Sequence, residues 1–347
     1  MNSRRRISGR GRRHTVRTDG SRRRRLTLGS ALMLSMSVSV SLALVVGVSS
    51  TTAAASPSRA SSIPLGAYAG TDNPLGVARF GSMTGAHMML GTDFLSRSNW
   101  GALEDAGGIG AWADSGYQLV LAVPMLPRRG RTSLVRGARG AYDSHFVTLA
   151  RNLVAAGEGN AYLRLGWEFN GNWYKWRVEN ARSAADFAAY FRDIVGAMRS
   201  VPGESFKFVW NPSADAMFGQ YTPSEAYPGN AYVDYIGTDV YDESWVEPLN
   251  PQTAWSNQLT CPWGLDWLSS FAAQEGKPIV FPEWGVAIRS DGHGLGDDPY
   301  FVNQFADWIT TQDVAWTSIF SFDGDQQDDI TDGSFPSALA AFKADFG

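Results

Sequence analysis

Eight short β-like runs recur along the chain, and they constrain its fold more than any other feature. Helical patterns separate many of the runs, and several runs are almost continuously apolar, as strands covered by helices should be. The predicted strands are residues 63–68, 87–94, 117–125, 161–168, 206–211, 232–241, 278–283 and 317–323. Eight such units in about 250 residues or slightly more predict a (β/α)8 TIM barrel.

An open, doubly wound α/β sheet is the alternative fold. Such a sheet usually carries a glycine-rich phosphate loop after its first strand, and residues 66–76 contain no G-x-G-x-x-G pattern. We therefore expect a single catalytic domain over residues 63–347. In a barrel, catalytic residues lie where the strands end and the βα loops begin.

Apolar stripes at helical spacing predict several of the intervening helices. One stripe contains Phe146, Leu149 and Leu153 and is followed by Gly157 as a stop. Ser183 with Asp186 resembles a capping box at the start of a second helix, and Pro299 suits the first turn of a third. We interpret these stripes as core packing.

The first 55 residues differ in composition from the rest of the chain. An arginine-rich start, an apolar run at 26–48 and Ala53 to Ala55 predict a signal peptide over residues 1–55, followed by a serine-rich linker at 56–62. A retained membrane anchor is the alternative, because the apolar run approaches spanning length. The arginines before Leu26 also fit a twin-arginine export signal, although any basic segment looks similar. Secretion is the expected localisation, with no stable membrane association after cleavage.

Charge and cysteine content exclude some classes of function. From Ser56 onward the chain has 19 basic and 33 acidic side chains, a net charge of −14, which argues against binding to nucleic acid. Cys261 is the only cysteine, so no intramolecular disulfide can form. We expect a monomer that needs no cofactor.

The stretch from Tyr162 to Trp176 runs from a strand pattern directly into a polar and aromatic loop. Because strand side chains alternate, Arg164, Gly166 and Glu168 should share one face, with Leu163 and Leu165 facing the helices. This places Glu168 in the barrel mouth. Arg164, deeper on that face, needs an acidic partner, in a structural role or as a group that tunes a catalytic carboxylate.

A second carboxylate, Glu283, ends the predicted seventh strand. Alternation places Ile279, Phe281 and Glu283 on one face. Glycoside cleavage needs one carboxylic acid to protonate the leaving oxygen and a second carboxylate on the other side of the anomeric carbon. Two glutamates facing across a barrel mouth meet that need, and a separation of ~5 to 5.5 Å gives retention of configuration.

These residues resemble glycoside hydrolase family 26, part of a retaining (β/α)8 clan that includes β-mannanases. The match is strongest at Arg164-x-Gly166-x-Glu168-x-Asn170-Gly171 and at Pro282-Glu283-Trp284-Gly285. The resemblance implies that Glu168 is the acid/base, that Glu283 is the nucleophile and that Tyr241 hydrogen-bonds it. With these, the predicted substrate-binding residues are Trp167, Asn170, Trp173, Tyr174, Trp176, Trp210, Asp239, Tyr241 and Trp284.

Two of these predicted roles have alternatives. Asp239, which is expected on the same face of its strand as Tyr241, binds a sugar hydroxyl or Arg164. Trp210 lines the cleft or belongs to the core. Trp245, Trp255 and Trp263, in the long segment after the sixth strand, extend the cleft or anchor that loop.

Two departures from the family leave the substrate open. Mannanases of the family usually have histidine immediately before the acid/base, where this chain has Trp167, and a tryptophan on the eighth strand, where it has Phe320-Ser-Phe322. A β-1,4-mannan is the first expectation for the polysaccharide, with β-1,3-xylan or mixed-linkage β-glucan as alternatives. A non-catalytic glycan-binding barrel and, less favoured, a polysaccharide lyase are the rivals from other classes.

An acidic cluster near the C-terminus suggests calcium at first sight. It contains Asp323, Asp325, Asp328, Asp329 and Asp332, but the spacing does not match the EF-hand loop. We interpret it as a solvated loop and predict no metal site.

Overall fold

Eight parallel strands form a closed barrel in the computed structural model, which describes residues 59–347 except 106–107, 215–217 and 325. Each strand pairs with the next along the chain, and the last pairs with the first. The predicted (β/α)8 barrel is therefore confirmed. The strands are β1 Leu65–Tyr68, β2 Met88–Phe94, β3 Gln118–Val123, β4 Tyr162–Leu165, β5 Lys207–Trp210, β6 Tyr235–Asp242, β7 Ile279–Val286 and β8 Val314–Phe320.

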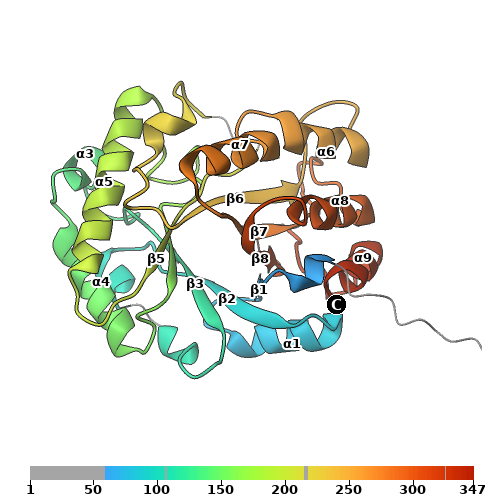
Figure 1. Cartoon of the computed structure of the whole chain (residues 1–347), viewed down its shortest axis with the longest axis horizontal. Coiled ribbons are helices and arrows are strands. Elements are labelled where there is room, and N and C mark those ends of the chain that lie inside the picture. The colour runs from blue at the N-terminus through green and yellow to red at the C-terminus, as the bar shows by residue number, and fades with distance from the viewer. Residues whose placement is uncertain (1–58, 106–107, 215–217, 325) are drawn as a thin grey trace, which may run out of the picture. The chain divides into compact units, whose positions relative to one another are not determined.

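Helices follow the strands along the chain and surround the barrel (Figure 1). The α-helices are α1 Pro74–Thr84, α2 Trp100–Glu104, α3 Leu134–Gly137, α4 Asp143–Ala155, α5 Ala181–Arg199, α6 Pro251–Thr260, α7 Leu265–Glu275, α8 Pro299–Ile309 and α9 Pro336–Phe346. Short 3-10 helices are η1 Arg59–Ser62, η2 Ile109–Ala111 and η3 Pro223–Ala226.

The stripes predicted as core packing are buried in these helices. Phe146, Leu149 and Leu153 of α4 are fully buried, and α8 begins at Pro299 as predicted. The start of α5 differs from the prediction. Its N-cap is Asn180, whose side chain accepts a hydrogen bond from the Ser183 backbone, so Ser183 is the third helical residue and not the cap.

The interior of the barrel is filled in two layers. A small apolar cluster, separate from the core between strands and helices, contains Leu90, Val120, Val209, Val280 and Trp316 from five different strands. Polar groups lie further along the strands, towards their carboxyl ends. They include the Thr92–Ser318 hydroxyl pair at 2.7 Å and the fully buried Arg164.

Alternation along β7 does not follow the predicted pattern. Val280 belongs to the barrel interior, whereas Phe281 packs outward on Phe305 of α8, with ring centroids 4.9 Å apart. The pairing of β7 with β8 shifts register between Phe281 and Trp284, which returns Glu283 to the inner side. The prediction that Phe281 and Glu283 share a face was wrong, because one irregular step separates them.

Trp210 and Trp284 do not line the cleft. Trp210 belongs to the core, the alternative given for it, and the prediction that Trp284 binds substrate was wrong. The ring of Trp210 packs outward on Phe271 of α7, and its indole N–H donates to the Ala226 carbonyl. The ring of Trp284 stacks on Phe305 at 4.2 Å. Both side chains are fully buried, since the outer face of a barrel strand packs under helices.

The predicted signal peptide, residues 1–55, and the first part of the linker lie outside the described residues. Residues 59–62 form η1, and Ala60 is buried, so ordered structure begins before Ile63. Within the described part of the chain, no helix has both the length and the apolar composition needed to cross a bilayer.

The buried position of Trp284 gives a stability prediction. Trp284→Ala removes a large side chain from the interface of β7 with α8 and α9, and should lower the free energy of unfolding by about 3–5 kcal/mol in urea titrations. Trp245→Ala is the matched control, because half of that side chain is exposed (50%) and its loss should cost under ~0.5 kcal/mol. Equal stability of the two variants would contradict the placement of Trp284.

Candidate active site

Glu168 lies in a turn after β4 and not on the strand. β4 ends at Leu165, and both Gly166 (φ 58°) and Glu168 (φ 52°) adopt left-handed backbone conformations. A left-handed glutamate is strained, and strain of this kind concentrates at functional sites. The backbone N–H of Glu168 donates to the Asn211 carbonyl at 2.8 Å, which ties the turn to the end of β5.

Arg164 connects the barrel interior to the second glutamate. Its guanidinium forms ion pairs with Asp239 at 2.6 Å and with Glu283 at 2.8 Å, and its Nε donates to the Asn211 side chain at 3.0 Å. Arg164 therefore has two acidic partners where one was predicted. Arg164 both fills a structural role and holds a candidate catalytic carboxylate.

The Tyr241 hydroxyl donates to the other oxygen of Glu283 at 2.8 Å, as the family resemblance implies. Burial and the negative charge of Glu283 raise the pKa of Tyr241 well above its usual value, so the hydroxyl keeps its proton. Glu283 is thus fixed by a cation on one oxygen and a hydrogen-bond donor on the other. Only 6% of it is exposed.

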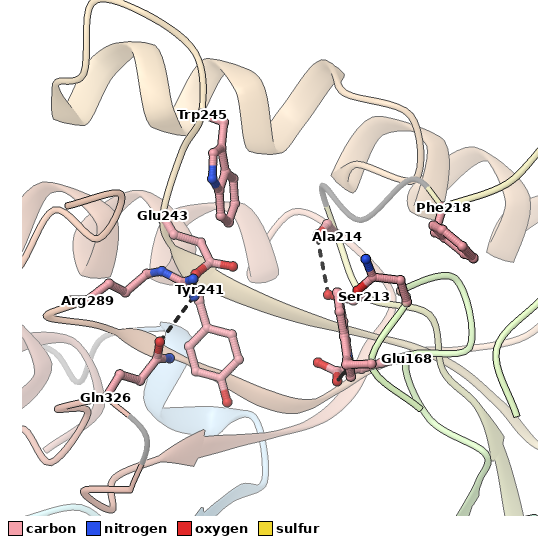
Figure 2. A pocket seen from close by; sticks show the side chains of 12 residues that line it. Glu168, Ser213, Ala214, Phe218, Tyr241, Glu243, Trp245, Arg289 and Gln326 are labelled. Carbon is pink, nitrogen blue, oxygen red and sulfur yellow. Dashed lines mark hydrogen bonds and ion pairs between the residues drawn. The ribbon is translucent and has the colours of Figure 1, made fainter. Parts of the chain in front are cut away.

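A cleft of two hollows opens above these residues. The Trp245 hollow, about 490 Å³, is shown in Figure 2, with Glu168 on one side and the Tyr241 ring on the other. The Arg128 hollow, about 740 Å³, contains Glu283. The two hollows meet at the side chains that line both of them, which are Glu168, Trp173, Tyr241 and Gln326.

Burial and the negative charge of Glu283 raise the pKa of Glu168 to about 8. The Trp173 indole N–H, which donates to Glu168 at 2.8 Å, and the Arg164 charge oppose this rise. No ion pair of Glu168 lies within 4.0 Å among the described residues. One carboxyl group is therefore held as a protonated acid beside another that is fixed by a cation, as general acid and nucleophile require.

Trp173 is one of the exposed aromatic residues of the cleft, with 51% of its surface accessible. Its ring lies against Gly171, where any Cβ would overlap the indole. The absence of a side chain at Gly171 thus leaves room for the indole, whose N–H reaches Glu168. The predicted stacking role stays a prediction, but the placement suits it.

The other predicted aromatics form a wall behind Trp173. Tyr174 is half-buried and accepts a hydrogen bond from the Trp167 indole at 2.9 Å. Trp176 is fully buried, stacks on Tyr174 at 4.5 Å and donates to the Trp167 carbonyl. Tyr174 lines the Arg128 hollow, but Trp167 and Trp176 are buried and line neither hollow, so the predicted contact of these two residues with substrate was wrong.

The side chains of Asn170 and Asp239 form their polar contacts within the protein. The Asn170 amide donates to the Ser213 carbonyl and accepts from the Ser213 backbone N–H, which joins the loops after β4 and β5. Asp239 pairs with Arg164, the structural alternative given for it. Neither is exposed to solvent, so the prediction of substrate contact is not supported for either.

Several cleft residues were missed from the sequence. Tyr68 and Phe94 end β1 and β2 and line the Arg128 hollow with Phe320 and Phe322. The rule that strand ends carry function would have found Tyr68 and Phe94. Trp245 lines the other hollow, whereas Trp255 and Trp263 are buried and anchor their loop.

In the part of the chain that the structure describes, no group of three or more His, Cys, Asp or Glu side chains is placed to hold a metal ion. Among the described members of the C-terminal acidic cluster, Asp323 and Asp332 cap their own loop, whereas Asp328 lines the Arg128 hollow. The Asp323 carboxylate accepts the backbone N–H groups of Asp328 and Asp329, and Asp332 accepts that of Ser334. Asp325 lies outside the described residues.

Comparison with known proteins relates the chain to one family. Residues 158–277 match the model of glycosyl hydrolase family 26, a range that includes Glu168 and Tyr241 and ends before Glu283. Endoglucanase H of Acetivibrio thermocellus is 24% identical over 83% of this chain and 31% of its own length. A mannan endo-1,4-β-mannosidase of Bifidobacterium adolescentis is 29% identical over 39% of this chain and 13% of its own length. The chain thus spans a third or less of these curated relatives.

Solved structures share the fold at low identity. A family 26 structure from Muricauda sp. MAR_2010_75 superposes with a TM-score of 0.58 at 16% identity and covers 82% of this chain and 85% of that one. A modular endo-β-1,4-mannanase of Cellulomonas fimi gives 0.56 at 17% identity, over 81% of this chain and 70% of that one. A β-mannanase of Bacteroides ovatus gives 0.53 at 15% identity, over 81% and 86%.

Proposed function

From the similarity of this chain to glycosyl hydrolase family 26, we propose that it is a retaining endo-β-glycanase in which Glu168 is the acid/base and Glu283 the nucleophile. The observation that carries the proposal is that two carboxyl groups in one cleft have different surroundings. Glu283 is fixed by Arg164 and Tyr241, while burial beside Glu283 keeps Glu168 protonated.

The reaction follows from this arrangement in two steps. Glu283 attacks the anomeric carbon while Glu168 gives its proton to the departing oxygen, which leaves a covalent glycosyl-enzyme. Glu168, now ionised, takes a proton from water as that water attacks the same carbon, and the carboxylate of Glu283 is released. Two inversions leave the product with the configuration of the substrate.

The two hollows support cleavage within a polymer. Sugar units have room on both sides of the reactive centre, because each hollow contains Glu168 and Tyr241. Glu283 lines the Arg128 hollow and is not among the described lining residues of the Trp245 hollow. The sugar that is attacked therefore occupies the Arg128 hollow with the non-reducing part of the chain, and the leaving part occupies the Trp245 hollow.

β-1,4-Mannan is the first substrate we propose, because the mannosidase relative and the family 26 mannanase structures point to it. The endoglucanase relative supports a β-glucan as the alternative. Where the family's mannanases have histidine, this chain has Trp167. The Trp167 ring is buried, and its N–H donates to the Tyr174 hydroxyl. If no glycan is cleaved, we would conclude that the protein binds glycans without catalytic turnover.

We also propose that residues 1–55 direct export of the protein. Their composition supports a cleaved signal, and they lie outside the described residues. N-terminal sequencing of the protein recovered from culture medium should begin at Ser56. An intact N-terminus found with the membrane fraction would favour the anchor instead.

Cleavage and its dependence on the two glutamates test the assignment. Reducing-end release from mannan, β-1,3-xylan and mixed-linkage glucan should identify a substrate, and Glu283→Ala should abolish that release. Azide added to this variant should restore turnover of an aryl glycoside and yield a glycosyl azide of inverted configuration, since azide then replaces the missing nucleophile. Undiminished hydrolysis by Glu283→Ala would remove it from the mechanism.

The leaving group separates the role of Glu168 from that of Glu283. Glu168→Ala should lose ~10²- to 10⁴-fold in kcat/KM on the polymer. It should lose far less on a dinitrophenyl glycoside, whose leaving group needs no proton. Equal losses on both substrates would contradict a general-acid role.

The pH profile tests the indole contact to Glu168. Activity should fall above about pH 8, where the acid loses its proton, because the pKa of Glu168 lies there. Trp173→Phe removes a hydrogen bond that favours the ionised carboxylate, so the pKa should rise and the alkaline limb of kcat/KM should move to higher pH. An alkaline limb that stays in place or moves down would contradict the contact.

A further inference from the structure

The loop after β3 carries positive charge in a protein whose net charge is negative. Residues 128–139 contain five arginines and no acidic residue, whereas the chain from Ser56 onward has a net charge of −14. The arginines are Arg128, Arg129, Arg131, Arg136 and Arg139. A charge run of this kind is often only a solvated surface, so its place in the structure decides what it does.

The loop is fastened to the rim of the cleft. The backbone N–H of Arg128 donates to the Arg97 carbonyl at 2.6 Å, which joins the loops after β2 and β3. The Lys175 ammonium donates to the carbonyls of Pro127 at 3.1 Å and Gly130 at 2.8 Å. These contacts hold Arg97 and Arg128 together on the wall of the Arg128 hollow.

Both guanidinium groups are available to a ligand. Arg97 is half-buried and lies over the Tyr174 ring at 4.9 Å, and Arg128 is exposed. Among the described residues, neither has a carboxylate within 4.0 Å. Arg289 in the Trp245 hollow contrasts with them, because Glu243 and Asp291 both pair with it at 2.7 Å.

We propose that Arg97 and Arg128 bind the carboxylate of an acidic sugar, such as a uronic acid, at the non-reducing side of the cleaved bond. The proposal rests on the function proposed above, which places the non-reducing part of the substrate in this hollow. A guanidinium offers a planar fork of donors that matches a carboxylate. Glu283 and Asp328 line the buried floor of the same hollow, so the acidic unit lies at the rim, beyond the sugar that is attacked.

Three hexasaccharides test this, each prepared from the glycan that the wild-type protein cleaves fastest. One is neutral, one carries a uronic acid at its non-reducing end, and one carries an aldonic acid at its reducing end. At low salt, kcat/KM for the uronate-ended probe should exceed that for the neutral probe by about fivefold, the upper range for an exposed charge pair. The preference should disappear in ~1 M salt. The aldonate-ended probe should show no preference.

Variants locate the effect. R97Q/R128Q should bring the ratio of uronate to neutral kcat/KM to about one. R139Q/R151Q makes the same change in net charge at exposed positions outside either hollow and should keep the wild-type ratio.

The outcomes separate the two proposals. Absence of cleavage of every polysaccharide tested would overturn the proposed hydrolase, and with it the carboxylate site that rests on it. If the neutral probe is cleaved, any of three results would overturn the carboxylate site alone. The wild-type ratio of uronate to neutral kcat/KM could be one, or both acidic probes could be preferred equally. The third result is the same loss of preference in both double variants.

Discussion

The site depends on one buried guanidinium that is shared by two carboxylates. Among the described residues, Arg164 is the only buried arginine or lysine, and it pairs with Asp239 and Glu283 inside the barrel. Isolated, a buried charge of either sign would be costly, and losing one partner of such a pair typically costs 3–5 kcal/mol. The fold therefore holds Glu283 in place with a group that it also needs for stability, while Glu168, in the same cleft, has no such partner. In the function proposed above, this difference separates the nucleophile from the acid.

The position of Glu168 follows from a backbone that leaves the sheet early. Two left-handed residues separated by Trp167 turn the chain at the end of β4, and the hydrogen bond to Asn211 fixes the turn against β5. The Asn170 amide extends that link to Ser213. Strain at Glu168 is thus held by contacts between neighbouring loops, so the acid is placed by the barrel rim as a whole and not by its own strand.

The fold could be predicted from the sequence, because apolar runs and helical stripes alternate along the chain. The rule that functional groups lie at strand ends also picked out Glu168 and Glu283, which line one hollow in the structure. Local irregularity could not be predicted. One register shift in β7 reversed the facing of Phe281, and the same rule of alternation that oriented Arg164 correctly failed there. Aromatic residues were hardest to place. Trp173 hydrogen-bonds Glu168 and Trp284 follows Glu283 in the sequence, yet Trp173 is exposed and Trp284 is covered by helices.

The two ends of the cleft differ in how their charges are balanced. In the Trp245 hollow, Arg289 is neutralised by Glu243 and Asp291 and also lies 5.3 Å from the Trp245 ring centre, so an arriving sugar meets paired charges and an aromatic face. In the Arg128 hollow, the carboxylates lie on the buried floor and the guanidinium groups at the rim. The Trp245 hollow therefore suits a neutral sugar. In the Arg128 hollow, negative groups lie at the bottom and positive groups at the entrance. Because the two hollows meet at Glu168 and Tyr241, recognition of the departing and the retained parts of a substrate can differ without any change in the chemistry between them.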